Sequence, residues 1–116
     1  MHKDFTAAIG PGSHAEGVST LASGSGAHAE GTVTQATHNY SHAGGLGTKT
    51  SAEGQTVVGS YNVNEPTAKF IVGIGELGAN ANGFSAGREN GEAYIKIGGT
   101  KISEKQLQQL LALLAE

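Results

Sequence analysis

A glycine recurs every seven residues through the first half of the chain, at Gly10, Gly17, Gly24, Gly31, Gly45 and Gly59, with the grid interrupted at His38 and Ala52. Two residues before the grid points stands an alanine in six successive repeats: Ala8, Ala15, Ala22, Ala29, Ala36 and Ala43. Two residues earlier again, the residue is Ser, Thr or Ala from Thr6 to Thr48. A fixed period of this kind indicates a repeat architecture, with each repeat one small structural unit.

A seven-residue period is also that of a coiled coil, but the residues exclude that structure. Coiled coils need large apolar side chains at two positions of each heptad, and a glycine within a helix costs about 1 kcal/mol relative to alanine. The alternation small-x-Ala-x-Gly is instead that of a short strand, followed by a two-residue turn. Because the triplet His-Ala-Glu recurs after fourteen residues, at His14 and His28, two repeats make one coil of a predicted β-solenoid.

The small residues are expected to point into a narrow lumen, which would be packed by Ala8, Ala15, Ala22, Ala29, Ala36 and Ala43. The other residues of each strand then point outward on two faces. One face is predicted to carry His14, Glu16, His28, Glu30, His42, Gly44, Thr56 and Val58. About four coils, spaced by about 4.8 Å, would make a body about 19 Å tall.

The composition supports a fold without a conventional core. Among 116 residues there are 19 Gly, three Tyr, three Phe and no Trp. With so few large side chains, the chain must pack backbone against backbone or bury surface against other chains. The net charge of −3 without a basic cluster argues against nucleic acid as a partner. The absence of Cys excludes disulfides and thiolate chemistry, and no apolar run approaches the length of a membrane span, so no membrane insertion is expected.

Three interpretations apply to the histidines that recur at fourteen residues. A ladder of His–Glu hydrogen bonds, which would fix the register between chains, satisfies the polar groups most simply and is favoured. A transition-metal site formed by His14, His28 and His42 is chemically reasonable because neutral imidazole is a common ligand, although the ligands would be spread along an axis. Catalysis would need a nucleophile with an orienting partner, which the pattern lacks, so neither an enzyme nor a cofactor is predicted.

A second fourteen-residue ladder consists of threonines, and it raises the possibility of ice binding: Thr6, Thr20, Thr34 and Thr48. These residues share the lumen-facing phase with Ser13 and Ala27, which favours packing instead.

The glycine grid stops at about Tyr61, and a linker or neck containing Pro66 is expected there. A strand is predicted over 69–75 and a hairpin over 84–97, with Asn90 and Gly91 in its tight turn. The C-terminal segment predicts a helix over 103–116, with Ser103 as N-cap and Gln106 completing a capping box. Its leucine stripe needs a partner, either two further copies of the helix or the chain's own strands: Leu107, Leu110, Leu111 and Leu114.

The stretch SHAEGVSTLASGSGAHAEGTVTQATHNYSHAGG resembles the head repeats of YadA-like trimeric adhesins, whose chains form left-handed parallel β-rolls packed three around an axis. The SHAEG variant, followed by TVVGSYN and FIVGIG, more closely resembles phage and prophage tail-fibre proteins, some of which continue into an autoproteolytic chaperone domain. The resemblance implies a homotrimer. Its interface would include His14, Glu16, His28, Glu30, His42, Val58, Leu107, Leu110, Leu111 and Leu114.

Together these observations predict a mainly β chain in three parts: a β-roll head (1–60), a β-meander neck (61–102) and a trimerising helix (103–116). The expected function is that of a non-enzymatic tail-fibre module in a virion, acting as a spacer or as a head that contacts a host cell-surface receptor. The alternatives are the head of a bacterial surface adhesin, a fragment of an autoprocessing tail protein whose protease domain is not in this chain, and an ice- or metal-binding solenoid.

Overall fold

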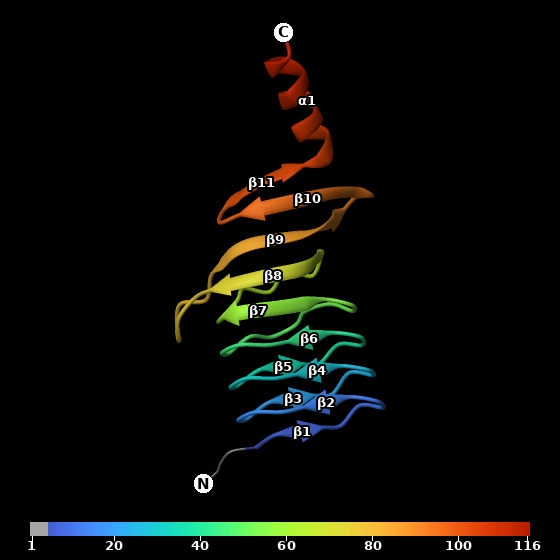
Figure 1. The fold of residues 1–116 in the computed structure, drawn as a ribbon, viewed down its shortest axis with the longest axis vertical. Coiled ribbons are helices and arrows are strands. Elements are labelled where there is room, and N and C mark those ends of the chain that lie inside the picture. The colour runs from blue at the N-terminus through green and yellow to red at the C-terminus, as the bar shows by residue number, and fades with distance from the viewer. Residues whose placement is uncertain (1–4) are drawn as a thin grey trace.

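The computed structural model describes residues 5–116, which form an elongated body measuring 63 × 29 × 17 Å. Short coils of chain are stacked along the long axis, and the only helix of the described residues extends from the end opposite the first coil (Figure 1). The chain is mainly β and contains a solenoid of about five turns, which confirms the predicted β-solenoid and adds one coil to the expected four.

Two-residue strands form the first three coils, and they alternate between two sheets. One sheet contains β1 (Ala7–Ala8), β3 (Leu21–Ala22) and β5 (Gln35–Ala36); the other begins with β2 (His14–Ala15), β4 (His28–Ala29) and β6 (His42–Ala43). All these pairs are parallel with an offset of fourteen residues, as in His14 opposite His28. Two strands per coil are therefore present, as the sequence period predicted.

Small side chains fill the solenoid. Ala22, Ala29, Ala36 and Ala43 are fully buried, and the lumen also takes in the buried side chains of Thr20, Thr34 and Thr48. The hydroxyls of Thr34 and Thr48 donate to backbone carbonyls four residues earlier, which satisfies them inside the lumen. Ala15 is half-buried. Ala8 is exposed, contrary to the prediction, because it lies in the first coil and no coil of the described residues covers its open side.

The recurrent glycines mark the places where consecutive coils approach most closely. Gly31 has φ +100°, and a Cβ atom there would lie 2.1 Å from the carbonyl oxygen of Gly45 in the next coil. The same distance of 2.1–2.2 Å recurs at the equivalent glycines 17, 45 and 59. At these four positions only glycine combines this backbone conformation with this approach. At Gly10 and Gly24 the approach of 2.1 Å to a carbonyl oxygen recurs without a positive φ, so the close contact between coils is what the grid positions share.

The coil register continues past residue 61, where the residue pattern predicted the roll to end. Strand β7 (Thr56–Ser60) pairs in parallel with β8 (Ala68–Ile74), and Thr56 stands opposite Phe70, again fourteen residues later. Larger side chains now fill the interior, with Val57 and Ile71 fully buried. The repeat motif therefore disappears from the sequence while the backbone period persists for one more turn.

The predicted neck segment closes this fifth turn and is held by buried polar side chains. Gln55 is fully buried, and its amide nitrogen donates to the carbonyls of Glu65 and Ala68, both at 2.9 Å. The Glu65 carboxylate accepts hydrogen bonds from Asn82 and Ser85, which both lie in the strand that follows β8. These contacts tie the loop before β8 to the strands that follow it.

Three antiparallel strands extend the same sheet beyond β8: β9 (Asn82–Glu89), β10 (Glu92–Ile97) and β11 (Thr100–Ser103). The β9–β10 turn has positive φ at Asn90 and Gly91, as the sequence predicted. The result is one eight-stranded sheet that begins in the solenoid and ends at β11 (Figure 1).

The C-terminal helix α1 (Glu104–Leu114) begins as predicted, with Ser103 as N-cap and Gln106 completing the capping box. None of its residues is buried, and its contacts are with β10 and β11 at its base. The alternative in which its leucines pack on the chain's own strands is therefore not what the structure shows. In the part of the chain that the structure describes, no helix is long and apolar enough to cross a membrane.

Candidate functional site

One face of the eight-stranded sheet runs along most of the molecule and carries the predicted interface residues of the solenoid. Side chains alternate across a strand, so residues that stand opposite one another share a face. The pairings align His14, His28, His42, Thr56 and Phe70, and then continue through the antiparallel strands. We call this surface, opposite to the lumen, the outer sheet face: His14, Glu16, His28, Glu30, His42, Gly44, Thr56, Val58, Phe70, Val72, Ile74, Phe84, Ala86, Ile95, Ile97 and Ile102.

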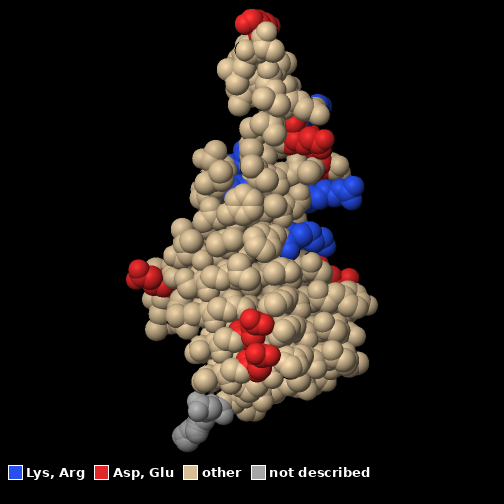
Figure 2. All heavy atoms as spheres, viewed as in Figure 1, with Lys and Arg blue, Asp and Glu red and all other residues tan. Residues whose placement is uncertain are grey.

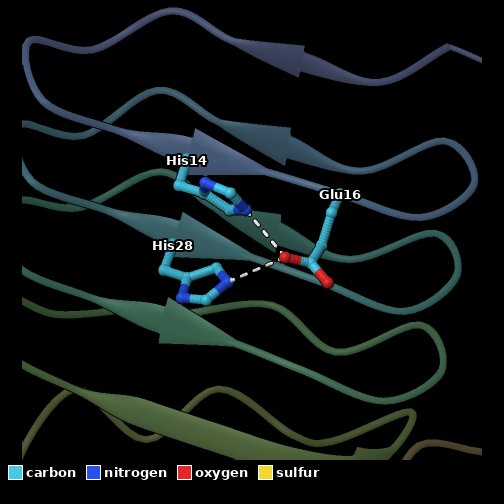
Figure 3. Close-up of side chains that lie close together, drawn as sticks. All are labelled: His14, Glu16 and His28. Carbon is cyan, nitrogen blue, oxygen red and sulfur yellow. Dashed lines mark hydrogen bonds and ion pairs between the residues drawn. The ribbon is translucent and has the colours of Figure 1, made fainter.

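At its N-terminal end the outer sheet face is polar. His14 Nε2 lies 2.7 Å from Glu16 Oε1, and His28 Nε2 lies 3.9 Å from the same oxygen, so both imidazoles point at one carboxylate (Figure 3). The pattern repeats one coil later, where Glu30 Oε1 lies 3.1 Å from His28 Nε2 and 3.7 Å from His42 Nε2. These five residues form what we call the histidine–glutamate ladder.

The rings of the ladder also contact one another. The ring centroids of His14 and His28 are 4.8 Å apart in an edge-on arrangement, and those of His28 and His42 are 4.7 Å apart and stacked. The third carboxylate is missing because Gly44 stands where Glu16 and Glu30 stand in the earlier coils. The fourteen-residue spacing in the sequence is sufficient to place these residues together, because the strands pair in register.

Towards its C-terminal end the outer sheet face becomes apolar and remains exposed. Phe70, Ile74, Ile95 and Ile97 are between 39 and 64% exposed. A shallow apolar hollow of about 190 Å³, lined in part by Ile95, Ile102 and Leu107, connects the sheet to the helix. In the view of Figure 2, most of the surface between the first coil and the helix is uncharged, and positive charges gather along one side of the meander.

The leucine stripe of α1 begins at this hollow, with Leu107, and continues along the helix. Leu107, Leu110, Leu111 and Leu114 are between 44 and 72% exposed, and their spacing places them on one side of the helix. The predicted interface residues therefore lie in two regions, the ladder with Val58 on the sheet and the leucines on the helix.

The apolar strands between these regions were missing from the sequence-based set. Two signals in the sequence point to them. Phe70 follows Thr56 by fourteen residues, and Ile95 alternates with Tyr94 and Lys96 in a hairpin strand. Assigning both to the same face needs the sheet topology, in which β8 pairs with the solenoid on one side and the meander on the other.

No protein-family model, curated protein or solved structure matches the chain. The class of the protein therefore follows from its architecture: a β-solenoid repeat protein with fourteen-residue coils, extended by an antiparallel meander and a helix.

Proposed function

We propose that this chain is a non-enzymatic structural module of a homotrimeric fibre, of the kind found in phage or prophage tails. The solenoid, a left-handed β-roll in this proposal, is the stiff spacer or receptor-facing head, and the meander and helix hold three chains together. The observation that carries the proposal is the exposed apolar part of the outer sheet face, which is continuous with the leucine stripe of α1.

A single chain leaves several large apolar side chains of the outer sheet face and of α1 exposed to water. Monomeric soluble proteins rarely expose contiguous apolar patches larger than a few hundred Å². Full burial of one Ile, Leu or Phe side chain contributes about 1.5–3 kcal/mol. In this chain large aromatic side chains are scarce, and many of the large apolar side chains that it has lie exposed on the outer sheet face or on α1. Burial against other chains is the direct way to gain their contribution to stability.

The helix gives a second argument for self-association. An isolated helix of eleven residues is marginal in water, and α1 buries none of its residues against its own sheet. Its leucines follow the spacing of a coiled-coil seam, in which identical stripes meet around an axis. Because the helix extends along the long axis of the molecule, an axis parallel to it brings both the helices and the outer sheet faces of several copies together (Figure 1).

The number of chains and the biological setting rest on the resemblance of the repeats. Heads built from similar repeats are trimers, which supports three copies here, and the SHAEG variant supports a tail fibre and therefore a virion. The turns of the solenoid would then face outward, available to a host cell-surface receptor.

The test is the mass of the full chain in solution, measured by light scattering during size-exclusion chromatography. The expected mass is about three times the 11.7 kDa of one chain. Replacing Leu111 by Asp should dissociate the assembly because it places a charge in the apolar seam. The matched variant Gln109→Asp, on the opposite side of the helix, should leave the mass unchanged.

A monomeric wild-type chain contradicts the proposal. So does an assembly that tolerates both Leu111→Asp and the corresponding sheet variant Ile97→Asp.

A further inference from the structure

We propose that the histidine–glutamate ladder binds one divalent transition-metal ion per chain, through Nε2 of His28, Nε2 of His42 and the carboxylate of Glu30. His28 and Glu30 come from the β4 coil and His42 from the next coil, at β6. All three ligands belong to one chain, so the inference is independent of the proposed trimer.

The distances between the candidate ligand atoms fit a bound ion. A zinc ion in tetrahedral coordination binds His nitrogen and carboxylate oxygen at about 2.0–2.2 Å, so two of its ligands are separated by about 3.3–3.6 Å. Glu30 Oε1 lies 3.1 Å from His28 Nε2 and 3.7 Å from His42 Nε2. Displacements of a few tenths of an ångström would therefore bring both His–Glu pairs to the coordinating distance, and the ligand atoms of all three residues lie within 4.8 Å of one another.

Without a bound ion, one nitrogen atom of the site has no hydrogen-bond partner. His28 Nε2 is buried and makes no hydrogen bond, because its approach to Glu30 has poor hydrogen-bond geometry. A buried polar atom without a partner destabilises the fold because it has lost its hydrogen bonds to water. Coordination by Nε2 would satisfy this atom.

Gly44, two residues after the proposed ligand His42, leaves room for the remaining ligands of the ion. Gly44 occupies the position where a third glutamate would continue the column, and a Cβ atom there would lie 3.4 Å from His42 Nε2. The glycine therefore keeps the space beside His42 Nε2 free of a side chain, so water can complete the coordination.

The other half of the ladder is the weaker site. His14, Glu16 and His28 also have ligand atoms close together, but His28 Nε2 can bind only one ion, so the two sites compete. Their spacings of 2.7 and 3.9 Å are less even, and His14 and Glu16 are more than 60% exposed. His28, Glu30 and His42 are 36–45% exposed, which protects bonds to an ion better from water.

The donor set selects the chemical class of the ion. Two imidazoles with one carboxylate suit Zn²⁺, Ni²⁺, Cu²⁺ or Fe²⁺, whereas Mg²⁺ and Ca²⁺ prefer oxygen ligands. An ion held by His28, Glu30 and His42 would link two consecutive coils of the solenoid outside the lumen, and so oppose their separation.

The test is calorimetric titration of Zn²⁺ into the full chain after treatment with EDTA and desalting. The titration uses a His2→Ala background, because His2, which lies outside the described residues, is an independent imidazole. One ion per chain is expected. His42→Gln and Glu30→Gln should each weaken binding at least tenfold. His14→Gln, which removes a ladder imidazole outside the proposed set, should leave the affinity unchanged, and Ca²⁺ should not compete.

Three results would overturn the inference: no saturable binding of Zn²⁺, one ion per three chains, or loss of binding in His14→Gln with retention in His42→Gln. Circular dichroism of each variant in EDTA keeps these outcomes separate from unfolding, since every substituted side chain lies outside the lumen. The mass of the protein measured with and without EDTA shows separately whether assembly depends on the ion.

Discussion

Replacing Gly31 by Ala tests whether close stacking of the coils, and not glycine's flexibility alone, accounts for the repeat. The new Cβ atom would lie 2.1 Å from the Gly45 carbonyl oxygen, which accepts the backbone hydrogen bond of Thr32 at 2.9 Å. Moving that oxygen away leaves the Thr32 N–H without its acceptor, at a cost of about 1–3 kcal/mol. The positive φ of the new alanine costs about 1–2 kcal/mol more. The expected loss of stability is therefore about 2–5 kcal/mol.

Gly26→Ala is the matched control. Gly26 also has a positive φ, +65°, but its nearest neighbour would be Cδ1 of Tyr40 at 3.6 Å, an ordinary contact. Only the conformational cost of about 1–2 kcal/mol is expected there. For a chain of this size, 1 kcal/mol corresponds to about 4 °C in Tm. Thermal unfolding followed by circular dichroism, at equal chain concentration, should therefore show a drop of about 8–20 °C for Gly31→Ala and a smaller drop of about 4–8 °C for Gly26→Ala. Equal losses would refute the stacking argument.

Three further predictions concern the lumen, the period and the closing loop. Ala36→Leu, in the filled lumen, should lower the free energy of unfolding by at least about 1–3 kcal/mol, while the outward Thr37→Leu should change it by less than about 0.5 kcal/mol; urea titration of both variants checks this. Deleting residues 21–34 removes one whole coil and should preserve cooperative unfolding, whereas deleting residues 21–27 moves every preceding strand to the wrong sheet and should abolish it. Glu65→Ala should lower the free energy of unfolding by about 2 kcal/mol because it removes the acceptor of two side-chain hydrogen bonds, and Glu65→Gln should lower it less. Thermal unfolding at equal chain concentration measures both variants, and equal losses of stability would contradict this prediction.

The solenoid could be predicted from the sequence because its constraints repeat. Every coil places a glycine at the same close contact and an alanine at the same lumen position, so each requirement appears several times in the sequence. The fifth turn could not be predicted in this way. There Val57 and Ile71 fill the interior and Gln55 spans it, so the requirement for small residues no longer holds although the backbone pairing does.

The two halves of the outer sheet face also differ in how far the sequence predicts them. The ladder follows from local repetition, because residues fourteen apart must stack when the strands pair in register. The apolar half depends on which strands pair after the repeats end. Ile95 joins the face of His14 only because β10 pairs with β9, β9 with β8, and β8 with the solenoid. No short-range pattern in the sequence encodes that order of strands.

A fibre module built on this single sheet would be stabilised by different interactions at its two ends. At the apolar end, contacts between chains are available to hold the structure, and each chain contributes exposed isoleucines and leucines. At the polar end the same face offers imidazoles and carboxylates, which contribute little when exposed to water. An ion bound within each chain would add stability at this end, where association between chains supplies least. The proposed trimer contacts and the proposed metal site therefore act on different parts of one face, and each can be removed without removing the other.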